Sequence, residues 1–340
     1  MIRDDEILRF LKEDPSRFLS GQEISRRLKV TRTAVWKRVK HLRALGYKIE
    51  SLTRSGYRLI QAPDLLIPSE ISTLLTTKWM GRTIHYFQSI DSTNLKAYQL
   101  ALQGAEEGEV VIAESQMEGK GRLGRRWFSP SFLNLYLSLI FRPPIPPHRA
   151  SLITLMAAVA TADAIQNYSG LLPQIKWPND VLLRGRKVAG LLSEIQSEMD
   201  RIHFVILGIG VNLNMEEKMF PKEIQNTATS LKRERGETVS RKDFLISLLI
   251  ALEDWYETFL KEGGGPILEA WRGWAKIEGK RVSVSSFGET LSGVAVDIDS
   301  DGALILEMGK GEHRRIVAGD VEYPLTPPSP QRGEGEGEGQ

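Results

Sequence analysis

The stretch GEVVIAESQMEGKGRLGRRWFSP, residues 108–130, decides between several folds because it contains a G-x-G-x-x-G pattern. Its three glycines are Gly119, Gly121 and Gly124. A dinucleotide-binding loop is followed by a helix whose N-terminus faces the pyrophosphate. Here residues 127–130, Trp-Phe-Ser-Pro, and then a strand-like run follow the loop. An acidic residue for the ribose is missing, since none occurs between Glu118 and Asp163. The stretch is therefore not a dinucleotide-binding loop.

Positive charge is the remaining feature of this loop. A P-loop is excluded because Lys120 is followed by glycine, and the kinase motifs H-R-D and D-F-G are absent. The cations of the loop are Lys120, Arg122, Arg125 and Arg126, and Trp127 follows them. Glycine allows close backbone approach, guanidinium groups bind phosphate with two parallel hydrogen bonds, and tryptophan offers a stacking face for a purine. We expect a loop that binds a phosphate and a nucleotide; a plain basic surface loop is the alternative.

Two further segments suit an anionic ligand. In IKWPNDVLLRGRKVAGLLSEI, residues 175–195, Lys176 ends a strand-like run just before a proline. A hairpin at residues 184–185 would return Lys187 to the same sheet, so that two lysines lie beside the basic loop. In GIGVNLN, residues 208–214, the glycines would let a ligand approach a buried strand. A proline turn and simple core packing are the structural alternatives.

Residues for covalent or metal catalysis are missing from the sequence. The chain has no cysteine and no G-x-S-x-G motif, and its five histidines lack metal-ligand spacing. We therefore expect no metal held by the protein itself. The chemistry would depend on positioning and on charge neutralisation of phosphate.

The composition predicts a cytoplasmic protein without membrane contact. A chain of 340 residues, 41% of them hydrophobic, is long enough for two or three domains with packed cores. No apolar run approaches the roughly 18 residues of a membrane span. The charged start MIRDDEILRFLKEDP is not a signal peptide, and without cysteine there are no disulfides.

The N-terminal region is basic although the net charge is only +2. Residues 21–60 contain eleven Lys or Arg and two acidic residues. Three short helices are expected, in DDEILRFLKED, SGQEISRRL and TRTAVWKRVKHLRALG. Ser20 and Glu23 form a capping-box pattern for the second helix. Thr31 can cap the third helix, which should end at Gly46.

The third helix has two different faces. Val35, Val39 and Leu42 share one face, which would pack inward. YKIESLTRSGYRLI would then form a hairpin around residues 54–56, as the wing of a helix-turn-helix whose second helix enters the major groove. We expect the DNA-binding residues to be Arg32, Thr33, Trp36, Lys37 and Lys40 of the helix and Arg54 of the wing. A small helical interaction domain is the alternative.

The region from residue 69 to residue 256 predicts a mixed α/β structure. Strand-like runs such as EVVIAES, LYLSLIF and FVILGIGVNLN alternate with helices expected at residues 151–168 and 241–260. Short strands follow, two of them joined by a turn at residues 299–302, and these predict a small β-barrel. Proline residues at 63 and 68 mark a linker before the α/β region.

These patterns divide the chain into four parts. We expect a winged helix over residues 1–62, a catalytic α/β domain over 63–270, a β-barrel over 271–325 and a disordered low-complexity tail over 326–340.

Six segments occur in the order found in biotin–protein ligases, and the chain resembles that family. They are DSTN (91–94), ESQMEGKGRLGRRWFSP (114–130), NLYLS (134–138), KWPND (176–180), RKVAG (186–190) and GIGVNLN (208–214). With the basic helix-turn-helix, the chain is similar over about residues 4–325 to the bifunctional form, biotin–protein ligase and biotin operon repressor. The resemblance implies a multidomain α/β fold: a winged helix, a mixed-sheet catalytic domain related to class II aminoacyl-tRNA synthetases, and an SH3-like C-terminal barrel.

The resemblance also implies a two-step reaction. Biotin attacks the α-phosphate of ATP to form biotinyl-5′-AMP, and a lysine of a biotin carboxyl carrier protein then takes the biotin. Mg²⁺ would enter with the ATP phosphates. Arg122 and Lys176 would be catalytic, at the reacting phosphate. The biotin-binding residues would be Ser92, Thr93, Asn94, Gln116, Lys120, Gly121, Arg122, Lys187 and Gly190. The ATP-binding residues would be Arg125, Trp127, Asn179 and Asn212.

The chain departs from the family pattern within the loop. The family often has arginine where this sequence has Lys120 and Leu123. Lysine keeps the charge but not the bidentate geometry of arginine. The other implied partner is operator DNA. A single winged helix per chain implies a homodimer on a palindromic site, and we expect biotinyl-AMP to strengthen it.

Two alternative functions belong to different classes. One is a lipoate–protein ligase on a related fold, which adenylation assays with either acid would distinguish. The other is a biotin-sensing repressor without ligase activity, against which Arg122, Lys176 and Lys187 argue.

Overall fold

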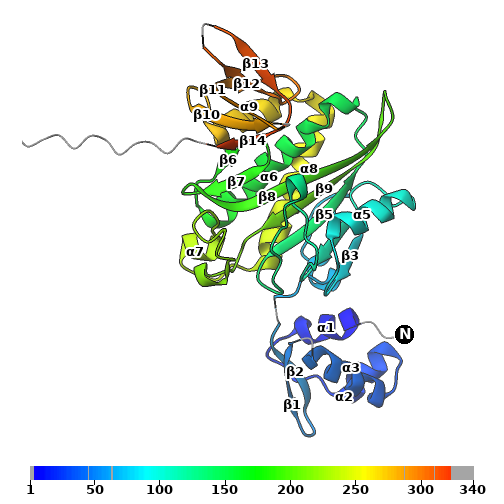
Figure 1. Ribbon diagram of the computed structural model, residues 1–340. Helices are drawn as coiled ribbons and strands as arrows, with labels where there is room; N and C mark the ends of the chain where they lie inside the picture. The colour runs from blue at the N-terminus through cyan, green and yellow to red at the C-terminus, as the bar shows by residue number, and fades with distance from the viewer. Residues whose placement is uncertain (1–3, 45, 63, 287, 310, 323–340) are drawn as a thin grey trace, which may run out of the picture.

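The computed structural model describes residues 4–322 apart from residues 45, 63, 287 and 310. The described residues form an N-terminal helical unit, a central α/β unit and a C-terminal β unit, which follow one another along the molecule (Figure 1). The tail expected to be disordered, residues 326–340, lies outside the described residues. Among the described helices, none is long and apolar enough to cross a membrane.

The N-terminal unit contains the three predicted helices. They are α1 (Asp4–Glu13), α2 (Gly21–Leu28) and α3 (Arg32–Ala44). Val35, Val39 and Leu42 of α3 are buried, as expected from their spacing, and pack in one cluster with α1 and α2. The hydrophobic stripe therefore leaves the opposite face of α3 to solvent.

The ends of these helices are fixed by side chains. The hydroxyl of Ser20 accepts a hydrogen bond from the backbone N–H of Glu23 at 3.0 Å, and that of Thr31 accepts one from Ala34 at 3.2 Å. Both predicted caps are confirmed. The carboxylate of Glu23 pairs with Arg17 at 3.1 Å instead of completing the capping box.

The predicted wing is the hairpin of β1 (Lys48–Leu52) and β2 (Gly56–Gln61). Gly56 has a φ of +115°, and a Cβ there would lie 2.1 Å from the carbonyl oxygen of Leu19. Only glycine fits this position, because Leu19 and Tyr57 exchange backbone hydrogen bonds of 2.8 Å beside it.

The central unit is built on a seven-stranded mixed sheet in the order β3-β4-β5-β9-β8-β7-β6. β3 and β4 run parallel, and the other described neighbours run antiparallel. The strands are β3 (Ile84–Phe87), β4 (Val110–Ala113), β5 (Leu135–Phe141), β6 (Gln174–Lys176), β7 (Asp180–Leu183), β8 (Arg186–Ser197) and β9 (Ile202–Val211). The mixed sheet expected from the sequence is confirmed.

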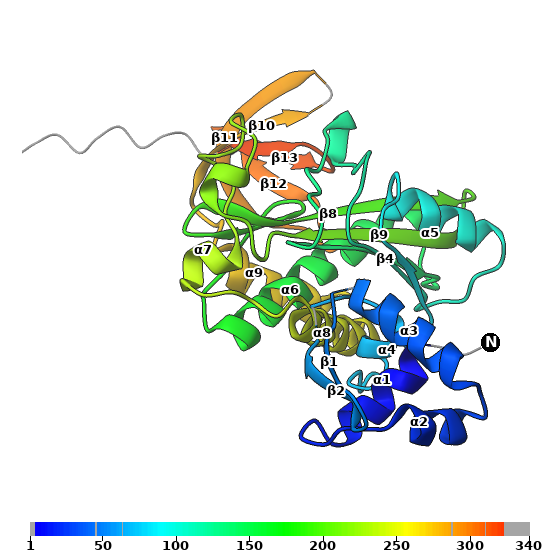
Figure 2. The same ribbon diagram turned by 90° about the horizontal axis from the view of Figure 1, so that it is seen from below.

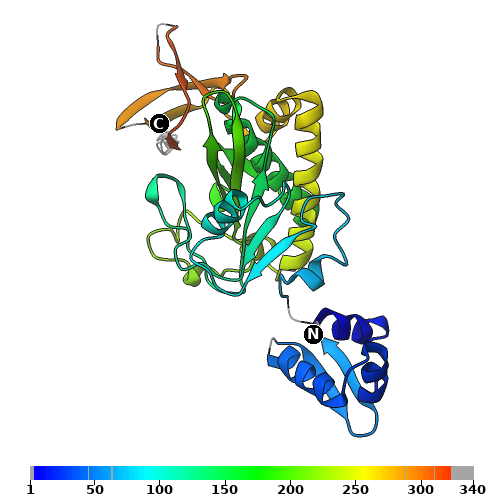
Figure 3. The same ribbon diagram turned by 90° about the vertical axis from the view of Figure 1, so that its right-hand side faces the viewer.

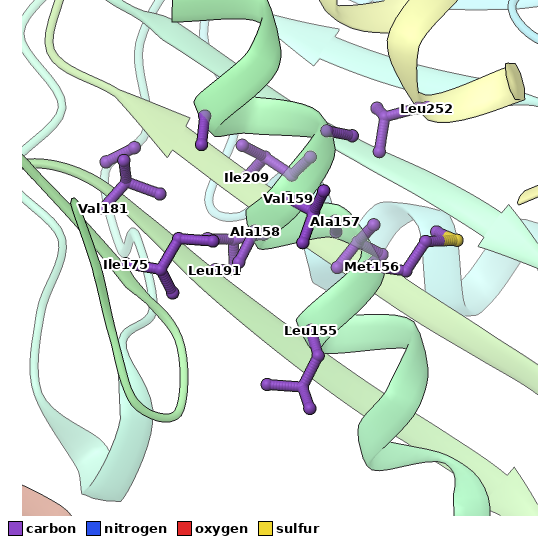
Figure 4. Close-up of a cluster of buried hydrophobic side chains, with 14 of the residues drawn as sticks. Leu155, Met156, Ala157, Ala158, Val159, Ile175, Val181, Leu191, Ile209 and Leu252 are labelled. Atoms are coloured by element: carbon purple, nitrogen blue, oxygen red, sulfur yellow. The ribbon is translucent and has the colours of Figure 1, made fainter. Parts of the chain in front are cut away.

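Three helices cover one face of this sheet (Figure 2). They are α6 (Ser151–Ser169), α8 (Arg241–Glu262) and α9 (Gly265–Ala275). Figure 4 shows Val159 of α6 among Leu191 and Ile209 of the sheet. Each such fully buried side chain stabilises the fold by about 1.5–3 kcal/mol.

The other face of the sheet has less helical cover. α5 (Thr93–Leu102) packs there against a small cluster that includes Phe204 and Ile206. Alternate residues of a strand face opposite ways, so Gly208 and Gly210, further along β9, face the same side as Ile206. Beyond α5, this face of the sheet therefore presents Gly208 and Gly210, and we call this region the glycine surface.

The C-terminal unit is an antiparallel sheet in the order β13-β12-β11-β10-β14. Its strands are β10 (Arg281–Ser286), β11 (Glu289–Ile298), β12 (Leu304–Glu307), β13 (His313–Ile316) and β14 (Asp320–Glu322). The predicted turn at residues 299–302 joins β11 to β12, and Gly302 takes a φ of +82° there. β14 carries Asp320, which pairs with Arg122 and Arg125 of the central unit.

Two of the longer helices, α5 and α9, were not predicted from the sequence. α9 begins at the last of three consecutive glycines, residues 263–265, and glycine more often ends a helix than begins one. α5 begins inside the DSTN segment, which was interpreted only for its side chains. The remaining short helices are α4 (Pro68–Ile71) and α7 (Leu231–Arg235), with 3-10 turns at Arg122–Gly124, Pro147–Arg149 and Glu217–Met219.

The N-terminal unit is tied to the central unit through Glu70 of α4. The buried carboxylate of Glu70 pairs with Lys12 at 2.6 Å and with Lys242 at 3.1 Å, and it accepts a hydrogen bond from the Tyr47 hydroxyl at 3.0 Å. Burial on its own would raise the pKa of Glu70. The hydrogen bonds and charges of Lys12 and Lys242 outweigh burial and hold the pKa below its ordinary 4.5.

We predict that Glu70→Gln lowers the free energy of unfolding by about 1.5–3 kcal/mol at neutral pH, because it removes charge-assisted hydrogen bonds. A carboxylate with a lowered folded pKa stabilises the fold above its ordinary pKa, and this contribution is lost as the pH falls through the folded value. The difference from wild type should therefore shrink below pH 4.5. Urea unfolding of wild type and variant, from neutral pH to below pH 4.5, measures this difference in the free energy of unfolding. The exposed Glu262→Gln is the control, and an equal effect of both variants would contradict the role of Glu70.

Candidate functional site

A cavity of about 440 Å³ opens on the glycine surface of the central sheet. The fourteen residues expected to bind biotin or ATP or to act in catalysis all line it. They are Ser92, Thr93, Asn94, Gln116, Lys120, Gly121, Arg122, Arg125, Trp127, Lys176, Asn179, Lys187, Gly190 and Asn212. The structure thus brings together residues that are spread over 121 positions of the sequence, from 92 to 212.

One end of the cavity is polar and uncharged, and it is built on the start of α5. Ser92 is the N-cap of α5. The side-chain oxygen of Gln116 accepts hydrogen bonds from the N–H of Thr93 at 2.9 Å and from its hydroxyl at 3.1 Å. The Ser138 hydroxyl lies 2.8 Å from the Thr93 hydroxyl. These bonds fix the polar groups in orientations that suit a small neutral head group.

Asn94 is fixed in the same wall. Its side-chain oxygen accepts from Ser138 at 2.6 Å, and its amide donates to Glu194 at 2.8 Å. A Cβ on Gly208 would lie 2.1 Å from the Asn94 oxygen. Glycine at this position therefore lets the asparagine lie flat on the strand.

The basic loop folds back on itself at the mouth of the cavity. Lys120 and Arg126 form a β-bridge, and the N–H of Gly121 donates to the carbonyl of Arg125 at 2.7 Å. Leu123 at the tip takes a φ of +54°, and its side chain is largely exposed. A leucine rarely adopts this left-handed backbone conformation, so the tip of the loop is strained at Leu123.

Trp127 closes the loop and lies on the sheet. Gly190 and Gly210 are paired across β8 and β9, and a Cβ on either would come within 2.8 Å of the indole ring. The ammonium of Lys187 lies 5.4 Å from the ring centroid, within the range of a cation–π contact. The indole N–H is buried without a hydrogen-bond partner among the described residues. The paired glycines thus form a flat floor for an aromatic ring.

Arg122 and Arg125 are paired with a carboxylate of the C-terminal unit. Arg122 donates to the side chain of Asn179 at 3.1 Å and to the carbonyl of Gly319 at 3.1 Å, and it lies 3.3 Å from Asp320. Arg125 forms a second ion pair with Asp320. Burial lowers the pKa of Arg122 while Asp320 opposes the shift, and an arginine stays charged in either case.

Other cations of the cavity also face carboxylates. Lys187 pairs with Asp180 at 2.6 Å, and Lys120 lies 3.8 Å from Glu194. Because the Lys120–Glu194 pair is at the surface and contributes about 0–1 kcal/mol, an anionic ligand can replace this carboxylate at small cost. Lys176, at the end of β6, also lines the cavity.

The two asparagines assigned to the nucleotide are anchored to the backbone. The amide of Asn179 donates to the carbonyl of Leu191 at 2.6 Å, and that of Asn212 donates to the carbonyl of Thr229 at 3.1 Å. Their positions are therefore fixed by the sheet and by the segment that precedes α7. The cavity as a whole combines a neutral polar end, a flat floor and a cationic mouth.

The residues expected to contact DNA are exposed on the N-terminal unit. They are Arg32, Thr33, Trp36, Lys37 and Lys40 on α3 and Arg54 on the wing. Trp36 is 51% exposed, and the Lys40 ammonium lies 5.6 Å from its ring centroid. An exposed tryptophan among cations on one helix face suits a nucleic-acid surface.

Several residues of the cavity were not assigned from the sequence. Gly208 and Gly210 had a signal, since the GIGVN glycines predict close approach, but no role was given to them. Asp180 lies within the KWPND segment, but no role was assigned to it from the sequence. Asp320 had no local signal, because it comes almost 200 residues after the loop with which it pairs.

Comparisons with known proteins match all three units. The chain matches models of the HTH domain over residues 3–58, of the biotin/lipoate A/B protein ligase family over 86–212 and of the biotin protein ligase C-terminal domain over 278–323. It is 39% identical to the bifunctional ligase/repressor BirA of Bacillus spizizenii, over 93% of this chain and 97% of that protein. It is 30% identical to BirA of Escherichia coli, over 85% and 88% of the two chains.

A solved structure has a similar fold. The biotin protein ligase of Aquifex aeolicus in complex with biotin and ATP aligns with a TM-score of 0.61 and 24% identity. The alignment covers 71% of this chain and 98% of that one. At this identity the likeness concerns the fold.

We predict that Gly210→Ala displaces the indole of Trp127, because the new Cβ would lie 2.4 Å from its ring. The ring should become more exposed, and tryptophan emission should shift to longer wavelength. The shift should be absent when Trp127→Phe is combined with Gly210→Ala. Gly273→Ala, in α9 with open space around it, is the control. An unchanged spectrum for Gly210→Ala would contradict the described packing.

Proposed function

This chain belongs to the biotin protein ligase family, in its bifunctional ligase and repressor form, and we propose that it biotinylates a carrier protein and represses transcription at an operator. The substrates are biotin, MgATP and a lysine of a biotin carboxyl carrier protein. The observation that carries the proposal is the cavity in which a neutral polar end, a flat glycine floor with Trp127 on it and several cations meet.

The geometry of the cavity supports a route for biotin activation. Ser92, Thr93 and Gln116 bind the biotin head group through polar atoms already held in place. The biotin carboxylate then lies toward the cations, and one of its oxygens attacks the α-phosphorus of ATP. Pyrophosphate leaves with the electron pair of the broken P–O bond. Arg122 and Lys176 stabilise the charge that builds up on the phosphate.

The nucleotide occupies the mouth of the cavity. Trp127 presents its ring to the adenine, and Asn179, Asn212 and Arg125 contact the nucleotide. Lys187 exchanges its partner, Asp180, for an oxygen of the ligand. Mg²⁺ enters with the ATP phosphates and neutralises part of their charge. No group of three or more acidic, histidine or cysteine side chains suited to a metal occurs in the part of the chain that the structure describes.

Transfer to the carrier protein completes the reaction. The neutral amine of the carrier lysine attacks the acyl carbon of biotinyl-AMP, an amide bond forms, and AMP leaves as the anhydride bond breaks. The loop of residues 119–127 covers the anhydride until then and limits hydrolysis.

DNA binding is the second activity. α3 enters the major groove with Arg32, Thr33, Trp36, Lys37 and Lys40, and Arg54 of the wing contacts the backbone. Two copies bind a palindromic operator as a two-fold dimer in the cytoplasm, and biotinyl-AMP strengthens the dimer by ordering the loop. The functional domains are residues 1–62, 63–270 and 271–325.

The test of catalysis compares wild type with Arg122→Gly. Wild type should form pyrophosphate from ATP with biotin but not with lipoate, and should then biotinylate the carrier. The loss of charge-assisted contacts worth about 1.5–3 kcal/mol should release labelled biotinyl-AMP roughly ten- to hundredfold faster and slow adenylation.

The control for this test is Arg184→Gly, which removes an exposed arginine at a turn with positive φ outside the cavity. Its release rate should equal that of wild type. Equal release from Arg122→Gly and wild type would refute the role of the loop. Adenylation of lipoate in place of biotin would refute the substrate assignment.

For DNA, we predict that Lys37→Ala and Lys40→Ala each reduce the slope of log affinity against log salt by roughly 0.9, since each removes one phosphate contact. Gel retardation of operator DNA at several salt concentrations gives the slope. Lys261→Ala, exposed at the end of α8, should leave it unchanged. A slope that neither α3 variant alters would place the DNA on another surface.

A further inference from the structure

One buried ion pair supports the cavity without lining it. Arg241, the first residue of α8, lies 2.6 Å from Glu114, and the two side chains are 1% and 0% exposed. Removing two charges from water is costly unless each is fully hydrogen-bonded. Neither residue has a part in the reaction proposed above, so the pair requires another explanation.

Glu114 fixes the strand end that carries the biotin-binding residue. It follows β4 directly and stands two residues before Gln116. Its carboxylate accepts the N–H of Leu66 at 3.1 Å and lies 3.3 Å from the Tyr86 hydroxyl. The direction in which the chain leaves β4, and with it the position of Gln116, depends on these bonds.

Arg241 reaches the nucleotide side of the cavity with the same guanidinium. It donates to the carbonyl of Asn134 at 3.2 Å. The side chain of Asn134 in turn accepts the N–H of Leu213 at 3.0 Å and lies 3.4 Å from the oxygen of Asn212. Arg241 therefore fixes both the segment of Gln116 and that of Asn212.

The linker after the N-terminal unit completes the arrangement. Asp64 accepts the N–H of Arg241 at 2.7 Å and that of Lys242 at 3.1 Å, so it satisfies two free N–H groups in the first turn of α8. Its carboxylate lies 3.5 Å from the Arg241 guanidinium, and its carbonyl accepts a second bond from that group. Figure 3 shows the long helix α8 beginning beside the linker.

We propose that Asp64, Glu114 and Arg241 are positioning residues, which set the biotin-binding and nucleotide-binding segments of the cavity relative to the interdomain linker. The proposal rests on the biotin-binding function proposed above. The three residues act through Gln116 and Asn212 and touch neither substrate. A change in the linker at Asp64 therefore alters biotin affinity from outside the cavity.

The chain contains a matched control for buried charge. Glu253 of α8 is also buried and accepts three backbone N–H groups, those of Lys78, Trp79 and Met80, at 2.6–3.0 Å. It does not line the cavity. Loss of its charge should destabilise the protein without moving the biotin-binding segment.

The experiment measures the Kd for biotin, the kinetic constants of adenylation and the Tm of the full-length chain. The variants are Glu114→Gln, Arg241→Lys and Asp64→Asn, with Glu253→Gln as control. We expect Glu114→Gln and Arg241→Lys to raise the Kd and KM for biotin roughly tenfold or more, and Asp64→Asn by a smaller factor in the same direction. The kcat should change less than KM. Glu253→Gln should lower Tm and leave both binding constants unchanged.

The outcomes separate the possible explanations. Unchanged biotin affinity in all three variants would overturn the proposal. A loss of affinity in Glu253→Gln equal to that in Glu114→Gln would also overturn it, because the effect would then follow stability alone. If Asp64→Asn has no effect while the other two do, the linker is not part of the cluster and that part of the proposal fails. Absence of biotin binding by wild type would refute the proposed function instead.

Discussion

The arrangement of the molecule depends on one constraint, which is that positive charges gathered at one edge of the central sheet must be balanced by negative charges. Cations from the loop, from β6 and from the β7–β8 hairpin converge on a single cavity, where they would repel one another. Carboxylates from β7, from β8 and from the C-terminal sheet lie against them. These pairs are partly exposed to solvent, and we propose that a phosphate takes the place of the carboxylates. The C-terminal unit thereby contributes to the site through Asp320.

The uneven packing of the sheet provides the space for a ligand. Helices fill one face with apolar side chains, whereas the other face, beyond α5, ends in the paired glycines Gly190 and Gly210. The two faces are linked at the start of α8, where Arg241 contacts Glu114 and Asn134, close in the chain or in space to the cavity-lining residues Gln116 and Asn212. Hydrogen bonds of Arg241 therefore connect the helical layer, the linker and the segments that line the cavity.

Local patterns were sufficient for much of this structure. The spacing of Val35, Val39 and Leu42, the caps Ser20 and Thr31, and the turn at residues 299–302 are confirmed. The loop residues and the lysines meet in one cavity, although their roles remain predictions. What the sequence could not indicate depends on distant contacts. Asp320 and Arg241 pair with residues that lie 195 and 127 positions away in the chain, and no spacing rule connects residues so far apart.

The central claim is that the cationic mouth of the cavity recognises the negative charge of an acyl-adenylate. The most direct measurement is the equilibrium affinity of the wild-type protein for biotinyl-5′-AMP, compared with an analogue in which an uncharged linker replaces the phosphate. Charge-assisted hydrogen bonds contribute about 1.5–3 kcal/mol each, so we expect the neutral analogue to bind at least roughly tenfold more weakly. Equal affinities for the two ligands would contradict the claim.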